Sequence, residues 1–383
     1  MEITVKNSDL LTALNLVRPA LDGKAGFESS HVYMRAVKGW LYLYTSNFFS
    51  QVLTKIEVTV KEEGEVLIPP QKLVDTLRTA DKDLIVNLKK IDDSKIKIKT
   101  KAFSFHLSCH TGVVQTSLRI KEQFPLKDPV IAAIDLKTLM EFYKRAQFCA
   151  LDTTSTGNLN ALKLIFYKAG CNITATDRTI ATYVNTGTEE GDQVSVMISK
   201  DEFGLLSKVF ASQKDCKFTI VINAAKTMVF FSAASTVYGA KLLAGSFPDI
   251  IGLFKKSPTY TFNLPTKELL TVSQRARIFS NASHTVEIKF NATSIELTTY
   301  AEKGKDGSDF TETVELLPGS KVENLEDTKV YVDIDYILNV LGSSSATETV
   351  IGYTDTKSPI MLSEALSENN THAQYVMVGK TKW

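Results

Sequence analysis

Six segments of the chain share one pattern, in which a short apolar strand runs directly into an amphipathic helix. In VLIPPQKLVDTL, Ile68 ends the strand, and Leu73, Val74 and Leu77 follow it by five, six and nine positions. Apolar residues at these offsets lie on one face of an α-helix. The anchors that end the six strands stand 63 to 68 residues apart, at Val5, Ile68, Ile134, Ile198, Leu264 and Val332. This near-constant period predicts a repeat architecture.

The six copies match the pattern to different degrees. The fifth position after the anchor is apolar in all six copies, and the sixth fails only at Gly204. The ninth position fails at Ser207 and Ser273. Chance is the alternative, because any amphipathic helix places apolar residues at such offsets. The even spacing is independent of the apolar pattern and favours the repeat.

Segments with alternating apolar and β-branched residues follow most of the predicted helices, as in LIVNLKKI, LNALKLIFY and TVEIKFN. Such segments are typical of strands. The chain is therefore predicted to be an α+β protein of six βαββ-type units. Consecutive units pair into three similar domains, 1–125, 126–254 and 255–383. In a two-layer arrangement helices cover one side of the sheets, so a curved array would carry its helices inside and its sheets outside.

Composition narrows the class of protein. The chain has 383 residues, of which 44% are hydrophobic and 23% charged, which suits folded domains. No apolar run approaches the roughly 20 residues that span a bilayer, and the start MEITVKNSDLL has no secretion pattern. The four cysteines are scattered and form no CxxC pair, which favours reduced thiols. We expect a cytoplasmic protein without a membrane partner.

Charge distinguishes the predicted helices only weakly from the rest of the chain. The six helices, taken as 8–24, 71–82, 135–147, 199–214, 265–280 and 333–345, sum to +3, whereas the whole chain carries +1. A small excess of positive charge suits loose, sequence-independent contact with phosphates. It suits a solvated helix face equally well.

Five segments resemble the β sliding clamps of bacterial replicative DNA polymerases: MEITVKNSDLLTAL, LIPPQKLVDTLR, ITATDRTIATY, GSFPDI and SQRARIFSNASHTVEIKF. Their order and spacing extend the resemblance over essentially the whole chain. It implies a head-to-tail homodimer of three-domain chains that closes into a ring around duplex DNA. The implied role is non-enzymatic and needs no cofactor or metal. Because a closed ring is retained topologically, weak phosphate contact would suit sliding.

The resemblance also implies three sets of functional residues. The DNA-facing set is Arg18, Lys24, Lys72, Arg78, Lys137, Lys144, Arg145, Lys200, Lys208, Arg275 and Arg277. The pocket for short linear peptides of the polymerase and the clamp loader comprises Thr176, Asp177, Arg178, Thr179, Ile180, Pro248, Leu253, Val376, Met377 and Val378. The dimer interface comprises Phe105, Leu107, Ile278 and Phe279, for which core packing is the alternative.

The chain departs from the family within the implied pocket. Bacterial clamps usually read Thr-Asp-Gly-His-Arg-Leu where this chain reads TDRTI, which is one residue shorter and lacks the Gly-His step. They usually end Met-Pro-Met-Arg-Leu, whereas this chain ends YVMVGKTKW. These differences predict a different peptide preference, and they favour a phage, mobile-element or distant bacterial origin.

Other functions have weaker support in the sequence. His106, Ser108 and His110 share one face of a strand but have no convergent carboxylate or cysteine that would complete a metal site. The VGKT sequence near the C-terminus lacks the earlier glycine and the following helix of a phosphate loop. Asp333 and Asp335 stand where acids cap a helix. A clamp-like scaffold that binds peptides without encircling DNA remains the alternative function.

Overall fold

The computed structural model describes residues 1–23, 28–110, 128–152, 158–168, 170–186, 189, 191–211, 213, 216–300, 309–325, 328–364 and 372–380. The chain divides into two compact units. Unit 1 comprises residues 1–137 and 201–243, and unit 2 comprises residues 138–200 and 244–383. Within the described ranges, no helix is long and apolar enough to cross a membrane.

In the described residues each copy has one strand, one helix and then three strands. The first contains β1 (Glu2–Lys6), α1 (Asn7–Val17), β2 (Val32–Val37), β3 (Trp40–Ser46) and β4 (Ser50–Glu57), followed by a short β5 (Thr59–Glu62). The second contains β6 (Gly64–Ile68), α2 (Pro70–Arg78), β7 (Ile85–Lys90), β8 (Lys95–Lys99) and β9 (Ser104–Ser108). The third contains β10 (Val130–Asp135), α4 (Leu136–Ala146), β11 (Ala161–Tyr167), β12 (Gly170–Thr176) and β13 (Ile180–Asn185).

The remaining copies repeat this order. The fourth contains β14 (Val194–Ser199), α5 (Lys200–Val209), β15 (Lys217–Ile222), β16 (Met228–Ala233) and β17 (Thr236–Lys241), and a short α6 (Ile251–Phe254) follows it. The fifth contains β18 (Tyr260–Pro265), α7 (Thr266–Phe279), β19 (Thr285–Phe290), β20 (Ser294–Thr299) and β21 (Phe310–Glu315). The sixth contains β22 (Thr328–Asp333), α8 (Ile334–Ser343), β23 (Glu348–Tyr353), β24 (Ile360–Glu364) and β25 (His372–Met377). Single 3-10 turns are η1 (Arg18–Ala20), η2 (Glu28–Ser30) and η4 (Gln147–Cys149).

Neighbouring copies exchange their first strands. Val5 of β1 lies opposite Val86 of β7, and Ile68 of β6 lies opposite Val32 of β2. In the same way β10 joins β15 and β14 joins β11, and β18 joins β23 and β22 joins β19. A copy therefore cannot complete its own sheet, which explains physically why the copies occur in consecutive pairs.

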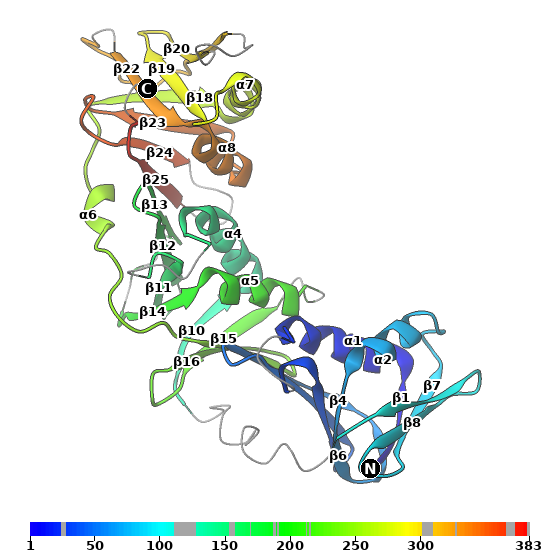
Figure 1. Cartoon of the computed structure of the whole chain (residues 1–383). Helices are drawn as coiled ribbons and strands as arrows, with labels where there is room; N and C mark the ends of the chain where they lie inside the picture. The colour runs from blue at the N-terminus through cyan, green and yellow to red at the C-terminus, as the bar shows by residue number, and fades with distance from the viewer. Residues whose placement is uncertain are drawn as a thin grey trace. The chain divides into compact units, whose positions relative to one another are not determined.

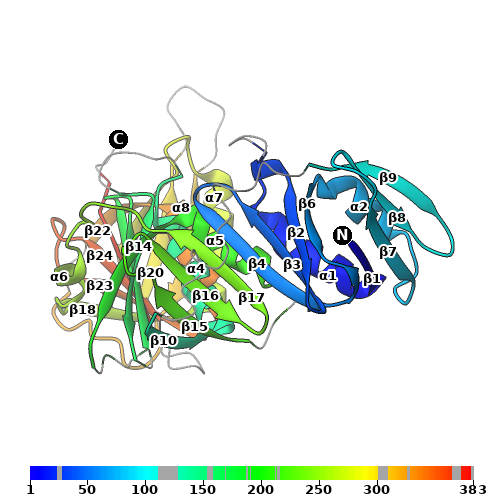
Figure 2. The ribbon, with the colours of Figure 1, turned by 90° about the horizontal axis from the view of Figure 1, so that it is seen from below.

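The exchanged strands build two antiparallel sheets in each unit, counted over the described residues. Unit 1 has a five-stranded sheet, β5-β1-β7-β8-β9, and an eight-stranded sheet, β10-β15-β16-β17-β4-β3-β2-β6. Unit 2 has an eight-stranded sheet, β14-β11-β12-β13-β25-β24-β23-β18, and a four-stranded sheet, β21-β20-β19-β22. Figure 2 shows β2, β3 and β4 of unit 1 running side by side.

Paired helices cover the sheets through their apolar faces. In unit 1, α1 and α2 lie side by side (Figure 1), and the buried face of α1 includes Leu10 and Leu14. The buried Asn7 side chain joins the two helices, because its Nδ2 donates to the carbonyl oxygens of Leu77 at 3.1 Å and Asp81 at 2.8 Å. In unit 2, α7 and α8 pack together in the same way.

The α+β repeat predicted from the sequence is confirmed. The structure shows three strands after each helix in the described residues, whereas the sequence pattern indicated two after each helix from the second copy onward. The helices also end earlier than the apolar pattern suggested, with α1 at Val17 and α5 at Val209. The three-domain boundaries remain a prediction, and the break expected near Phe124 lies outside the described residues.

Candidate partner patch, sheet edges and basic residues

An apolar patch covers the pairing of β13 with β25 in unit 2. Ala181, Ile250, Phe254 and Val376 form its buried part, and three half-buried side chains pack against them: Tyr183, Phe247 and Met361. Ala181 lies directly opposite Val376, and α6 packs on β25. At the border of the apolar patch Leu253 stays 37% exposed and Val378 52% exposed. Exposed apolar side chains around a covered cluster are typical of a binding surface.

The turn between β12 and β13 borders the apolar patch and is held by side chains. Asp177 Oδ1 accepts hydrogen bonds from the backbone nitrogens of Thr179 at 2.7 Å and Ile180 at 2.8 Å. Thr176 Oγ1 accepts from the backbone nitrogen of Arg178 at 3.0 Å. The hydroxyl of Tyr336 donates to Asp177 Oδ2 at 2.7 Å. Burial and the Asp177 carboxylate raise the pKa of Tyr336, so this hydroxyl keeps its proton.

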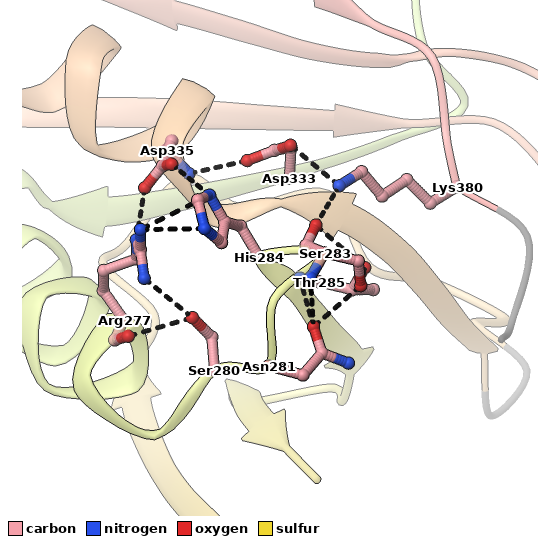
Figure 3. A network of polar contacts seen from close by, with 9 residues as sticks. All are labelled: Arg277, Ser280, Asn281, Ser283, His284, Thr285, Asp333, Asp335 and Lys380. Atoms are coloured by element: carbon pink, nitrogen blue, oxygen red, sulfur yellow. Dashed lines mark hydrogen bonds and ion pairs between the residues drawn. The ribbon is translucent and has the colours of Figure 1, made fainter. Parts of the chain in front are cut away.

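A polar network holds the C-terminal residues of unit 2 to the start of α8 (Figure 3). Lys380 Nζ lies 2.7 Å from Asp333 Oδ2, and Asp333 Oδ1 accepts from the backbone nitrogen of Asp335 at 3.0 Å. Arg277 Nε and His284 Nδ1 each lie 2.5 Å from an oxygen of Asp335. The capping role predicted for Asp333 is therefore confirmed.

This network has the residue types of a cation site but is already neutralised. One ligand atom each from His284, Asp333 and Asp335 lies within 4.8 Å of the others. Asp335 is paired with Arg277, and Asp333 is paired with Lys380. Because two positive side chains already balance the two carboxylates, the arrangement is an ion-pair network that holds Lys380 beside the start of α8.

All four sheets are open within the described residues, and two of their edge strands carry exposed or half-buried aromatic and apolar side chains. These edge strands are β9, in unit 1, and β21, in unit 2. Aromatic side chains accompany both. On β9, the ring of Phe105 lies 6.0 Å from that of Phe103. Beside β21, the rings of Phe279 and Phe310 stack at 5.3 Å, and the neighbouring Ile278 is 78% exposed.

Comparisons with known proteins find beta sliding clamps among the relatives of the chain. No family model matches the chain. The beta sliding clamp of Chlamydia muridarum is 19% identical over 347 residues, which are 88% of each chain. The beta sliding clamp of Mycoplasma capricolum is 20% identical over 385 residues, which are 96% of this chain and 97% of that one.

Solved structures agree with the curated relatives. The DNA polymerase sliding clamp of Pseudomonas aeruginosa superposes with a TM-score of 0.85 at 18% identity, covering 100% of both chains. The DNA polymerase III beta chain of Streptococcus pneumoniae gives 0.86 at 16% identity, again over 100% of both. The chain is a divergent relative of the beta sliding clamps. A Helicobacter pylori beta clamp with the same fold, at a TM-score of 0.81 and 19% identity over 100% of both chains, was solved bound to a DNA ligase peptide.

The basic residues predicted to face DNA differ in their exposure to solvent and in their ion pairs. Those exposed to solvent are Lys72, Arg78, Lys137, Lys144, Lys208 and Arg275. Arg275 is also paired with Glu312, and Arg78 lies 3.8 Å from Asp75. Arg18 is half-buried and donates to Gln71 Oε1 at 2.9 Å. Arg277 belongs to the network of Figure 3, and Lys24 lies outside the described residues.

Two of the predicted DNA-facing residues are both ion-paired and mostly buried. The Arg145 side chain is 0% exposed and forms ion pairs with Glu364 and, at 2.8 Å, with Glu141. Lys200 is 13% exposed, pairs with Asp152 and donates to the carbonyl oxygen of Ala150 at 3.1 Å. The prediction that Arg145 contacts DNA is wrong, because its guanidinium is buried and forms ion pairs within unit 2. Lys200 is unsuited to DNA contact for the same reason.

Some predicted pocket and interface residues are core residues. Ile180 and Met377 lie opposite each other in the sheet and are each 1% exposed. Successive strand residues face opposite sides of a sheet, so these two lie on the face away from Ala181 and Val376. Leu107 is 5% exposed and packs inside unit 1. Ile180, Met377 and Leu107 therefore offer little surface to a partner.

Other residues of these sites were missed from the sequence. Phe247, Phe254 and Tyr183 belong to the apolar patch, and Phe310 supports Phe279. The GSFPDI motif pointed to Phe247, because it stands one residue before Pro248. Nothing in the sequence indicated Tyr336, whose contact with Asp177 spans 159 residues of chain.

Proposed function

We propose that the protein is a DNA polymerase sliding clamp. Two copies associate head to tail into a ring around duplex DNA and tether a replicative polymerase to it. The observation that carries this proposal is the full-length correspondence with beta clamps in fold. The six repeated copies and their reciprocal strand exchange support the same architecture.

The two sheet edges supply the surfaces for ring closure. An edge strand presents unpaired backbone groups that favour pairing with another chain. We propose that β9 of one protomer adds to β21 of its partner, with Phe105 meeting Ile278 and Phe279. Because the two edges differ, the contact is heterologous and forms a ring when its rotation closes.

DNA contact in this proposal uses the exposed basic residues of the helices. We expect Lys72→Glu/Lys144→Glu/Lys208→Glu to weaken binding to a labelled duplex and to flatten its dependence on salt. The slope of log affinity against log salt should fall by about 0.9 for each phosphate contact that is lost. Fluorescence anisotropy across a salt series measures both quantities.

A matched variant controls for overall charge in that experiment. Lys38→Glu/Lys95→Glu/Lys99→Glu changes the net charge equally, but on the β2–β3 turn and on strand β8. We expect this control to keep the salt slope of the unmodified protein. Equal slopes for the helix variant and the unmodified protein would show that the helix lysines do not meet DNA.

Partner binding in this proposal uses the apolar patch. The peptide-bound Helicobacter pylori clamp supports a peptide site in a relative of this chain. We expect Leu253→Asp to weaken binding of the capped synthetic peptide Ser-Leu-Asp-Leu-Phe-Gly by about tenfold or more, because a charge would replace an apolar contact at the border of the apolar patch and would lose water on binding. The dissociation constant is measured by fluorescence anisotropy.

The control for the apolar patch is an exposed aliphatic residue elsewhere in the chain. Ile91 is 51% exposed and lies in unit 1, outside the apolar patch. Ile91→Asp should bind the peptide like the unmodified protein. If both variants bound it equally well, the apolar patch would not be the partner site.

The proposed role is mechanical and non-enzymatic, and we place it in the cytoplasm with the replication machinery. Beta clamps are the relatives that the comparisons name. A scaffold that binds peptides without encircling DNA is therefore not favoured. A solution mass separates the two, because a scaffold needs no second copy.

A further inference from the structure

The turn between β3 and β4 in unit 1 exposes two neighbouring phenylalanines. Phe48 is 70% exposed and Phe49 is 54% exposed. Among the described residues, no other aromatic side chain is as exposed as these two. They belong neither to the apolar patch of unit 2 nor to the edge strands of the proposed ring. Apolar side chains gathered at one exposed place are typical of an interaction surface.

This turn is firmly held. Asn47 Oδ1 accepts hydrogen bonds from the backbone nitrogens of Phe49 at 3.1 Å and Ser50 at 2.7 Å. Phe48 has a φ of 70°, in the left-handed region that residues with a Cβ rarely adopt. The carbonyl oxygen of Phe49 accepts a hydrogen bond from the backbone nitrogen of Lys241 at 2.7 Å. Strain that the surroundings maintain is concentrated at binding sites, and here it presents the two rings in one fixed place.

The β3–β4 turn repeats the turn that borders the apolar patch of unit 2. There Asp177 Oδ1 accepts from two backbone nitrogens in the same way, and Arg178 has a φ of 80°. The carbonyl oxygen of Thr179 accepts from the backbone nitrogen of Val378 at 2.9 Å, which is the counterpart of the bond at Phe49. The first and third copies of the repeat therefore carry the same turn in different units.

The apolar cluster beside the turn is repeated as well. In unit 1 it covers the pairing of β4 with β17, where Leu53 lies directly opposite Val237. These two side chains and Met228 are half-buried and pack against a buried cluster that includes Tyr44 and Phe230. Strand residues alternate between the two faces of a sheet, so the turn continues this face at its end. The unit-1 patch is defined as Phe48, Phe49, Leu53, Met228 and Val237.

The charges that border the unit-1 patch are isolated and of both signs. Lys241 Nζ lies 5.7 Å from the ring centroid of Phe49, and Lys55 lies toward the other end of β4. Glu65 accepts a hydrogen bond from the Tyr33 hydroxyl at 2.6 Å. Single-stranded nucleic acid also stacks on exposed aromatic rings, but it needs a positively charged groove along its backbone. Isolated charges do not supply such a groove, so the unit-1 patch favours an apolar peptide.

We propose that the unit-1 patch is a second docking site for short linear peptides, whose apolar side chains pack beside the rings of Phe48 and Phe49. The inference rests on the proposed partner role for the class of ligand, but it uses different residues in a different unit. A chain with two such sites holds two peptide segments at once. A partner that carries two segments would therefore bind with increased avidity.

The variant Leu253→Asp tests the unit-1 patch by itself, because it disables the apolar patch of unit 2. The probe is the capped synthetic peptide Ser-Leu-Asp-Leu-Phe-Gly. Isothermal titration calorimetry should show two peptides bound to each chain of the unmodified protein. In Leu253→Asp we expect one peptide per chain, bound saturably and with lower affinity than at the apolar patch.

A second substitution identifies the surface that binds this peptide. Phe48→Gly removes the more exposed ring and suits the left-handed backbone, so the variant should fold at least as readily. Added to Leu253→Asp, it should weaken the remaining binding by about tenfold or more, because aromatic anchors dominate small interfaces. Ile91→Ser removes another exposed apolar side chain of unit 1 and should leave the remaining binding unchanged.

The possible results separate the second site from the first. One peptide per unmodified chain, with none bound to Leu253→Asp, would overturn the second site and leave the apolar patch as the partner site. Binding that was lost in Phe48→Gly alone and unchanged in Leu253→Asp would support the second site and contradict the first. If the peptide bound to none of the proteins, both sites would be contradicted.

Two further results would overturn the assignment of the surface or of its ligand. Peptide binding by Leu253→Asp that Phe48→Gly did not weaken would place the second site elsewhere. A fluorescent oligothymidylate that bound the unmodified protein and lost its binding in Phe48→Gly, while peptide binding stayed intact, would make the unit-1 patch a nucleic-acid site.

Discussion

Replacing Phe279 by aspartate should convert the protein into folded monomers. Phe279 is 40% exposed, stacks on Phe310 at 5.3 Å and stands beside the edge strand β21. In the proposed ring it is a central aromatic anchor, and such anchors contribute about 2 kcal/mol or more to an interface. A buried carboxylate adds a desolvation cost, so we expect dimer affinity to fall more than about a hundredfold. Light scattering after size-exclusion chromatography measures the mass.

A second substitution distinguishes loss of the dimer interface from misfolding of the protomer. Ile278 is 78% exposed within its own chain, so Ile278→Asp should leave the fold intact and still weaken the dimer. Ile85, which is 52% exposed in unit 1, is the matched control, and Ile85→Asp should remain dimeric. If Phe279→Asp and Ile278→Asp both remained dimers, the assignment of the ring interface would have to be abandoned.

Replacing Arg145 by methionine should destabilise the protein by about 3 to 5 kcal/mol, because it leaves a buried carboxylate without its cation. Glu364 is 1% exposed, and burial raises its pKa while Arg145 opposes that rise. Without Arg145 the pKa of Glu364 rises further, so the folded variant holds a proton that the unfolded chain loses. The loss of stability should therefore be smaller at pH 5.5 than at pH 7.5. Urea unfolding at both pH values measures it.

The double variant Arg145→Met/Glu364→Gln is the control for that experiment. It removes both charges, so most of the stability should return and its dependence on pH should disappear. Lys144→Met, at the exposed neighbouring position of α4, should change stability by less than about 0.5 kcal/mol. A loss of stability at Arg145→Met that was the same at both pH values would contradict the role assigned to Glu364.

The sequence pattern predicted the elements that begin each copy because those elements are determined locally. In VLIPPQKLVDTL the apolar residues end β6, and Pro70 begins α2 with Leu73, Val74 and Leu77 buried. Proline is favoured in the first turn of a helix, where its missing N–H is not needed. The same local logic placed Asp333 as a cap.

One of the third strands, β17, was hard to predict because its sequence carries a glycine. β17 reads TVYGAK, and glycine is depleted in strands. Its Gly239 is needed because an added Cβ would stand 2.7 Å from the ring of Phe230. Such a close approach depends on a neighbouring strand and leaves no periodic signal in the sequence.

The functional residues also divide into those indicated by local sequence and those determined by distant contacts. The FPD motif and the TDRTI turn are local, and they led to the apolar patch. The partners that decide what a charge does are distant, since Glu364 stands 219 residues from Arg145. A helix pattern assigns every charged residue to solvent, so the burial of Arg145 could not be predicted from its own neighbourhood.

The most direct test of the proposed clamp is small-angle X-ray scattering with absolute mass on the purified protein. We predict a mass of twice 42.4 kDa and a pair-distance distribution with the depleted short distances of a hollow ring. A mass of 42.4 kDa that persisted to roughly 100 μM, or a dimer with the profile of a solid body, would contradict the closed ring and with it the proposed function.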